Sequence, residues 1–324
     1  MVSDSSILED NFVEVDDESG DAEPVDAYGS YGDFQLVGHG NVTSEMCGRW
    51  LGFRGCIRTD LHDHVSLSGE NFKGKVFVRH VHHSCDKPSC PVCYKSGWAV
   101  RAARKIAVRM QEASKRFGSV EHIVATVPPS FYGLDYDALR IKVVKILLDR
   151  GVIGGALIFH GFRYNLRHAW YWSPHFHVLG VILGGYRCRD CKKKCFRGCG
   201  GFVDRSYRCF EKDKCIVRVL GKRKTVAGTA WYQLNHATIR VGIPRFHVAT
   251  WFGVCGYRKL KVSSEKRKSL CPMCGEELVR LHYLGDRRIV KVKDQQGYVG
   301  SFVDDLVGAD GLPDWCEAHS GSYV

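Results

Sequence analysis

The chain has 324 residues, of which 44% are apolar, an ordinary share for a globular protein that is long enough to form two or three folded units. No apolar run approaches the roughly 18 residues that span a bilayer, and the N-terminus lacks the basic and apolar segments of a secretory signal. These features argue against a membrane protein or a secreted one, and we expect the protein in the cytoplasm.

Charge is distributed unevenly along the chain. Residues 1–48 contain twelve acidic residues and residues 301–324 contain five, and neither segment has a Lys or Arg. Residues 49–300 therefore hold 18 acidic residues against 47 basic ones, a formal charge of +29. A segment so basic favours a polyanionic partner, with nucleic acid as the first candidate and a basic surface without a specific partner as the alternative. We predict a disordered acidic leader over residues 1–45 and an acidic tail over 301–324.

The first basic element is a helix that follows a cysteine cluster within residues 46–118. From Trp98 to about Phe117, apolar residues recur at three- and four-residue steps, which predicts an amphipathic helix. Its remaining positions are largely basic. A helix of this kind can lie along a phosphate backbone, or it can simply have a solvated face. The candidate DNA-binding residues here are Arg101, Arg104 and Lys105.

Residues 119–183 have the pattern of a compact unit of strands and helices. We predict strands at Val120–Val127, Gly155–Tyr164 and His175–Leu183, and a helix at Asp135–Asp149. Pro128 and Pro129 end the first strand, and Gly151 ends the helix. A Cys-, Lys- and Arg-rich insertion over 184–222 follows, then a helix over about Val226–Arg240 and a segment resembling a small zinc ribbon over 246–300.

The fifteen cysteines fall into clusters with the spacing of metal ligands. Pairs two to four residues apart, in a chain without a signal peptide, are typical of zinc sites rather than disulfides. We therefore expect two or three structural zinc ions. The predicted ligands are Cys56, Cys85, Cys90 and Cys93 in the first cluster, Cys188, Cys191, Cys195 and Cys199 in the second, and Cys271 and Cys274 in the third.

Several ligand pairings stay open at this point. Cys47 is the alternative to Cys56, and His80, His82 and His83 are also available to the first cluster. Cys209 and Cys215 make the pairing of the second cluster ambiguous. For Cys271 and Cys274, the candidate partners are Cys255 and His282. Within the second cluster, basic residues indicate a zinc-shaped loop that grips DNA, namely Lys192, Lys193, Lys194 and Arg197.

The sequence Ser173-Pro-His-Phe-His-Val-Leu179 carries two histidines at alternate positions of a predicted strand. Residues i and i+2 of a strand share a face, so His175 and His177 present two imidazoles side by side. Two imidazoles so placed can hold a divalent metal and leave coordination positions open for a substrate oxygen. The alternative is an ordinary strand that happens to contain two histidines.

A tyrosine lies on the helix predicted after the insertion. Asn235 and His236 follow Tyr232 at i+3 and i+4, so the helix places these three side chains in one polar row beside its apolar stripe. That position suits a nucleophile that reaches toward a metal. A tyrosine at the rim of a core, with its hydroxyl hydrogen-bonded, is the alternative.

The order of these motifs resembles that of the HUH endonucleases that initiate rolling-circle replication. A strand ends in Ala125-Thr-Val-Pro-Pro129, the next motif is His175-Phe-His177, and a helix bearing Tyr232 follows. The segments Ser173–Leu179 and Ile158–Arg163, with the cysteine-rich flanks, look most like replication initiators of archaeal plasmids and viruses. The resemblance covers roughly residues 119–245. It implies an α+β fold whose HUH-type antiparallel sheet, ferredoxin- or RRM-like, has helices and small zinc-binding subdomains.

In many members of that family a lysine follows the tyrosine by three or four residues, where this chain has Asn235 and His236. Tyr207 and Tyr257 are therefore alternative nucleophiles. The resemblance also requires a third metal ligand. We expect His160, because it lies on the neighbouring predicted strand and acidic residues are scarce nearby, with His168 as the second choice.

The resemblance implies a chemistry and a set of partners. His175 and His177 would hold Mg²⁺ or Mn²⁺ against the scissile phosphate of single-stranded origin DNA, and Tyr232 would attack phosphorus to leave a 5′-phosphotyrosyl link and a free 3′-OH. Gly69–Val76 resembles a phosphate-binding loop but lacks its final Ser or Thr. Unwinding and synthesis would therefore fall to a host helicase and polymerase. A transposase or relaxase with the same chemistry, and a non-catalytic zinc-dependent DNA-binding regulator, are the alternatives.

Overall fold

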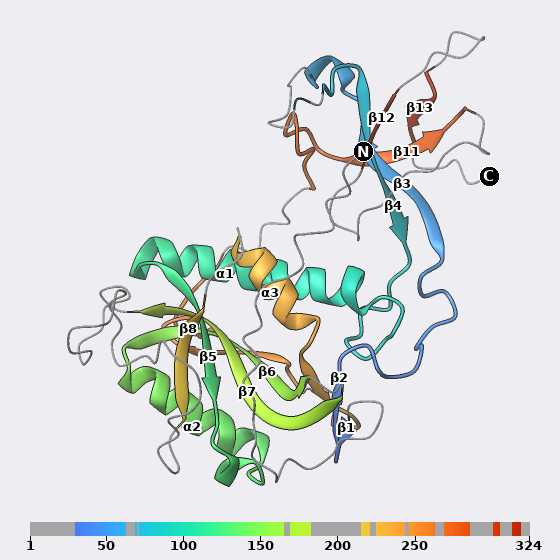
Figure 1. The fold of residues 1–324 in the computed structure, drawn as a ribbon. Coiled ribbons are helices and arrows are strands. Elements are labelled where there is room, and N and C mark those ends of the chain that lie inside the picture. Colours follow the sequence, from blue (N-terminus) through green and yellow to red (C-terminus); the bar gives the residue numbers. More distant parts are fainter. Residues whose placement is uncertain are drawn as a thin grey trace. The chain divides into compact units, whose positions relative to one another are not determined.

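The structure is a computed structural model that describes residues 30–62, 69, 71–164, 169–182, 215–220, 225–243, 246–262, 269–285, 301–304 and 313–318. The chain divides into two compact units, which we describe separately. Unit 1 comprises Met1–Asn41, Pro88–Tyr94 and Ala99–Val262, and unit 2 comprises Val42–Lys87, Lys95–Trp98 and Ser263–Val324. The architecture is α+β, with antiparallel sheets and few helices (Figure 1).

Unit 1 is built on a five-stranded antiparallel sheet of order β10-β6-β7-β5-β8. Its strands are β5 (Val120–Thr126), β6 (Val152–Tyr164), β7 (Trp170–Ile182), β8 (Ile216–Leu220) and β10 (Ala249–Gly253). The three strands predicted between residues 119 and 183 are present, although β6 and β7 are longer than expected. Their β-branched and aromatic residues suit a sheet that is buried on both faces.

Three helices accompany this sheet: α1 (Val100–Phe117), α2 (Tyr136–Asp149) and α3 (Val226–Leu234). A π-helical turn at Tyr94–Ala99 precedes α1, and a 3₁₀ turn at Pro129–Phe131 follows β5. The Asp135 carboxylate accepts hydrogen bonds from the backbone N–H groups of Asp137 and Ala138, which fixes the start of α2 near its predicted position. Gly151, at φ 83°, follows the end of α2 in a conformation that favours glycine.

The two faces of the sheet are covered by different helices. Leu139, Val143 and Leu147 of α2 belong to one core cluster with Phe176 and Val178 of β7. Side chains alternate along a strand, so the residues between them, including His175 and His177, face away from α2. Helices α1 and α3 lie side by side in Figure 1, on the side of the sheet away from α2. The histidine-bearing face is therefore the one next to α3.

Helix α3 ends six residues before its predicted end. Residues Thr238–Arg240 form strand β9, which pairs with β2 (Phe34–Leu36), and β2 pairs with β1 (Ser30–Tyr31). The Arg240 guanidinium also forms an ion pair with the Asp33 carboxylate. This small sheet falls partly within the predicted acidic leader, and β8 falls within the predicted insertion. In both cases a short segment pairs with a strand that is distant in sequence.

Unit 2 contains a second five-stranded antiparallel sheet, of order β12-β4-β3-β11-β13. Its strands are β3 (Trp50–Cys56), β4 (Lys75–His82), β11 (Val279–Tyr283), β12 (Ser301–Asp304) and β13 (Trp315–Glu317), with a 3₁₀ turn at Thr59–Leu61. Strands β12 and β13 come from the predicted acidic tail. The predicted segment 246–300 is divided, since β10 belongs to the sheet of unit 1 and β11 to that of unit 2.

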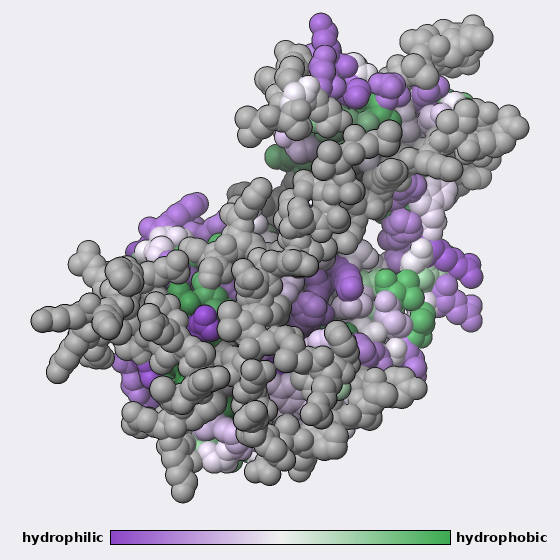
Figure 2. All heavy atoms as spheres, in the orientation of Figure 1, coloured by the Kyte–Doolittle hydropathy of each residue, from purple (hydrophilic) through white to green (hydrophobic). Residues whose placement is uncertain are grey.

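A small apolar core of Val76, Val78, Leu281 and Trp315 lies on one face of the unit 2 sheet. On the face drawn in Figure 2, hydrophilic residues lie at the surface of both units. Across the described ranges, none of the helices has the length and apolarity that a membrane span requires.

Candidate metal centre

Three histidines converge on the face of the unit 1 sheet that lies next to α3. His160 of β6 is directly opposite His175 of β7, and His177 follows two residues later on the same face. The ring centroid of His160 lies 5.2 Å from that of His175 and 4.4 Å from that of His177. One nitrogen of each ring lies within 4.8 Å of the others. The structure thus brings together both histidines of the His-x-His motif and the expected third residue.

One nitrogen of each of these rings has a hydrogen-bond partner outside the group of three. His175 Nδ1 lies 2.8 Å from the Ser173 carbonyl, and His160 Nε2 lies 2.9 Å from the carbonyl of Gln233 in α3. His177 Nδ1 lies 3.0 Å from His122 Nε2. Metal-binding histidines are commonly held by such an outer contact, which fixes the ring and leaves the other nitrogen for the metal.

Burial sets the charge state of the three rings. It lowers the pKa of His160 to about 3, with the nearby charge of His236 adding to the effect. Burial also lowers the pKa of His175 and of His177, where Arg163 and the neighbouring histidines oppose protonation further. The rings are therefore neutral near pH 7, which is the form that binds metals.

The group fits a divalent cation on these observations. Three neutral imidazoles, each oriented by an outer hydrogen bond, supply one nitrogen each. Three protein ligands leave further coordination positions open, as in catalytic sites. Imidazole donors favour transition ions such as Mn²⁺ over Mg²⁺ in affinity.

A fixed positive charge lies beside the histidines. Arg163, on β6 beyond the irregularity that follows His160, donates a hydrogen bond to the hydroxyl of Thr126 at 2.9 Å. Thr126 ends β5 and is directly opposite His175. A guanidinium held in this way can bind a phosphate oxygen close to the metal-binding nitrogens.

Tyr232 lies one residue before Gln233, whose backbone contacts the histidine group. The Tyr232 ring is half-buried and packs against His236, with 5.1 Å between the ring centroids. The predicted polar row is only partly present, because Asn235 is buried while His236 is exposed. Of the alternative nucleophiles, Tyr257 is 68% exposed and its ring contacts the Arg109 guanidinium, whereas Tyr207 lies outside the described residues. The alternative third ligand, His168, also lies outside them.

Among the described residues, cysteines also lie in two groups with metal-binding geometry. The first includes Cys90 and Cys93, two members of the predicted first cluster that lie close together in unit 1. The prediction that Cys56 completes this cluster is wrong, because Cys56 belongs to the other group. The predicted ligands Cys188, Cys191, Cys195 and Cys199 lie outside the described residues, as do Lys192, Lys193, Lys194 and Arg197.

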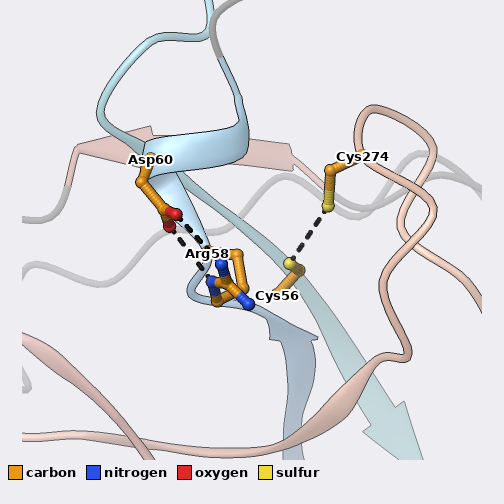
Figure 3. Close-up of polar contacts among 4 residues, drawn as sticks. All are labelled: Cys56, Arg58, Asp60 and Cys274. Carbon is orange, nitrogen blue, oxygen red and sulfur yellow. Dashed lines mark hydrogen bonds and ion pairs between the residues drawn. The ribbon is translucent and has the colours of Figure 1, made fainter.

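The second group consists of Cys56, His62, Cys271 and Cys274, all in unit 2. The Sγ atoms of Cys56 and Cys274 point toward each other and are 3.6 Å apart (Figure 3). Cys271 Sγ is 3.2 Å from His62 Nε2. Two sulfurs bound tetrahedrally to one zinc at about 2.3 Å lie roughly 3.8 Å apart, so the spacing fits zinc. His62 Nδ1 lies 2.7 Å from the Lys75 carbonyl, which leaves Nε2 free to bind.

This grouping corrects the expected partners of Cys271 and Cys274. Cys255 is buried in unit 1, and its carbonyl accepts a hydrogen bond from Arg109. His282 lies opposite Cys316 in the sheet rather than beside the two cysteines. Burial, with a hydrogen bond and charge from the adjacent cysteines, raises the pKa of Cys56 to about 12. Thiols crowded in this way favour a bound cation over separate ionisation.

Helix α1 exposes basic side chains and buries apolar ones, as its sequence pattern predicts. Arg101, Arg104 and Lys105 of α1 are exposed, whereas Ala103, Ile106 and Met110 are buried. Arg109 differs, because its guanidinium is buried over the rings of Trp251 and Tyr257 and donates to the carbonyls of Cys255 and Leu260. It packs unit 1 internally and presents no surface charge.

Sequence reasoning missed His122, Gln233, Arg163 and His62. His122 and Thr126 lie four residues apart in β5 and so share a face of the strand, a signal that is visible in the sequence. His62 follows Cys56 by six residues, which is also a readable spacing. The contacts of Gln233 and Arg163 depend on the packing of α3 and on the irregularity in β6, and no local pattern reveals them.

We expect His122 to position His177 for metal binding. Gln233 Nε2 lies 3.3 Å from His122 Nε2, so His122 links α3 to the ring of His177. Replacing His122 with alanine should weaken Mn²⁺ binding about 10- to 100-fold, the usual effect of losing an outer partner, while His122→Gln should restore part of it. Isothermal titration calorimetry with Mn²⁺ measures both. Equal affinities in wild type and His122→Ala would contradict the positioning role.

Comparison of this chain with protein-family models, with curated proteins and with solved structures finds no match in any of the three. The geometry of the site therefore carries the functional argument.

Proposed function

We propose that this protein is an HUH-type endonuclease that nicks and rejoins single-stranded origin DNA, starting rolling-circle replication of a plasmid or virus in the cytoplasm. One observation carries the proposal: three neutral histidines converge on the sheet face next to α3, and α3 bears Tyr232 beside Gln233, which holds His160. A purely DNA-binding protein has no use for this arrangement.

The architecture is compatible with an HUH core. The His-x-His strand β7 lies inside an antiparallel sheet, the third histidine comes from its neighbour β6, and the tyrosine helix follows later in the chain. This order agrees with the sequence motifs that resemble the family. The group of Cys56, His62, Cys271 and Cys274, with its four Cys and His donors, would be a structural zinc site.

The residues suggest a division of roles. A divalent cation bound at the histidines would polarise a non-bridging oxygen of the scissile phosphate. Arg163 would hold the same phosphate by charge. The Tyr232 oxygen would bond to phosphorus as the bond from phosphorus to the 3′ oxygen breaks. The 3′ oxygen would take up a proton from water, so the leaving strand ends in a 3′-OH. The phenol proton must leave, and His236, in ring contact with Tyr232, is a group that can accept it.

The phosphotyrosyl link keeps the energy of the broken ester, so rejoining needs no ATP. The free 3′-OH would prime a host polymerase, and a host helicase would open the duplex. A transposase or a relaxase would use the same chemistry, and the DNA that flanks the gene separates these from an initiator.

A covalent adduct tests the proposal. The full-length protein is incubated with Mn²⁺ and a 3′-labelled library of single strands whose central sequence is randomised, then run on a denaturing gel. We expect a shifted, labelled protein band that is lost in Tyr232→Phe, which keeps the ring that packs on His236. Tyr257→Phe, at an exposed ring, is the matched control and should keep the band.

Two results would refute this assignment in different ways. An adduct that persists in Tyr232→Phe means that another residue is the nucleophile. If wild-type protein gives no adduct with any strand in the library, the endonuclease proposal fails and a zinc-dependent DNA-binding regulator becomes the better reading.

A further inference from the structure

Three arginines form one row across the sheet of unit 2. Arg54 of β3 is directly opposite Arg79 of β4 on one side and directly opposite Arg280 of β11 on the other. Residues paired in this way share a face, and their Cβ atoms lie about 4.5–5.5 Å apart. The register therefore lines up three positive side chains on three adjacent strands.

A row of like charges opposes the pairing of its strands. Like charges directly opposite one another in a sheet are destabilising, so this sheet folds in spite of the row. Arg54 and Arg280 are exposed, and Arg79 is half-buried. None of the ion pairs found among the described residues involves Arg54 or Arg280. An external anion would relieve the repulsion that the register creates.

The central arginine is held in place by the backbone. Arg54 Nε donates a hydrogen bond to the Leu278 carbonyl at 3.1 Å, which leaves its terminal N–H groups for another acceptor. Leu278 N in turn donates to the Ser269 carbonyl at 2.7 Å, beside the turn that carries Cys271 and Cys274. The turn that carries Cys271 and Cys274 thus supports the start of β11, the strand that bears Arg280.

The surface beside the row is open. Gly52 precedes Arg54 by two residues and shares its face, and a side chain added there would meet no atom within 4 Å. His282, two residues after Arg280, extends the same face. An extended ligand therefore has room to lie across the strands next to the guanidinium groups.

We propose that the Arg79–Arg54–Arg280 row binds the backbone phosphates of single-stranded DNA. The ligand follows from charge complementarity with a chain whose residues 49–300 carry +29, and guanidinium groups match phosphate geometry with paired donors. The inference rests on the proposed function in taking single-stranded DNA as the ligand. The contact itself requires neither the histidine metal nor cleavage, and it carries no base specificity.

Arg280 is the best position for a test, because it is exposed and its side chain has no described hydrogen bond or ion pair to lose. Binding of the full-length protein to a fluorescein-labelled oligo-dT strand is measured by anisotropy in EDTA over a series of NaCl concentrations. Arg280→Ala should weaken binding roughly 5- to 10-fold and reduce the salt slope by about 0.7, the value for one phosphate contact on a single strand.

Two variants serve as controls. Arg280→Lys keeps the charge and should keep most of the slope. Lys73→Ala removes an equal charge from an exposed position of the same unit outside the row, and should change the affinity less than about twofold. If Arg280→Ala binds with the affinity and slope of Lys73→Ala, the row is not a phosphate-binding site.

The adduct assay separates this inference from the proposed function. If the protein forms the tyrosine adduct but Arg280→Ala binds oligo-dT as the wild type does, only the proposal of a phosphate-binding arginine row is refuted. A protein whose binding falls in Arg280→Ala, but which forms no adduct, supports the row and refutes the endonuclease.

Discussion

Replacing Cys271 with serine is expected to unfold the sheet of unit 2 and to remove one zinc ion per chain. The four ligands of its group come from two segments far apart in sequence, Cys56 with His62 and Cys271 with Cys274. A metal bound there would join β3 to the turn before β11, whose register it would hold. Structural zinc contributes on the order of 10–16 kcal/mol of binding free energy, which in a small domain is folding free energy.

The apolar cores of unit 2 are too small to replace that contribution. One described core has four buried residues, and another consists of Cys56, Phe77, Cys271 and Leu278, so two of its members are candidate metal ligands. Small units of this kind usually need a metal or disulfides to fold stably. Loss of the ion would therefore remove both the cross-link and part of the core.

Elemental mass spectrometry and hydrogen exchange measure the two effects together. In Cys271→Ser we expect one zinc fewer per chain and rapid exchange in β3, β4 and β11, while β6 and β7 of unit 1 stay protected. Cys316→Ser is the matched control, since Cys316 lies in the same sheet but outside the metal-binding groups of the described residues. Continued protection of β3 and β11 in zinc-free Cys271→Ser would show that the metal is not what holds unit 2 together.

The sequence predicts the elements of unit 1 well where local signals bound them. Pro128 ends β5, Asp135 begins α2 and Gly151 follows it, and each acts through the backbone of its own neighbourhood. The helical spacing of Trp231, Leu234 and Thr238 predicts a longer α3 than the structure has. Thr238–Arg240 instead pairs with β2, some 200 residues away in the chain, and a local pattern carries no information on such pairing.

The candidate metal ligands also differ in how well local sequence patterns predict them. His175, His177 and His160 could be found because strand alternation and a neighbouring strand place them on one face. The partner of Cys271 and Cys274 could not, because Cys56 reaches them only through the pairing of β3 with β11. Arg109 fits the basic side of α1 in sequence, yet it is buried by rings from residues 251 and 257. Tertiary packing decided each of these outcomes.

Replacing His177 with alanine is expected to remove Mn²⁺ binding at the histidine group and, with it, the tyrosine adduct. The His177 ring centroid lies 4.4 Å from that of His160 and 5.2 Å from that of His175, and its Nδ1 contacts His122. Its loss takes away one of three ligands, so affinity should fall by more than the roughly 10- to 100-fold that the loss of an outer partner costs. His177→Gln keeps much of the side-chain volume at this half-buried position and tests whether a cavity, rather than the missing ligand, causes the change.

Electron paramagnetic resonance of Mn²⁺ gives the binding, and the labelled-strand gel gives the adduct. His247→Ala, at an exposed histidine of the same unit, should leave both unchanged. Tyr232→Phe should bind Mn²⁺ normally and still form no adduct, because the hydroxyl and the metal ligands have separate roles. Unchanged Mn²⁺ affinity in His177→Ala would mean that the ion binds elsewhere. An adduct that survives the loss of Mn²⁺ would mean that Arg163 and its neighbours activate the phosphate without a metal.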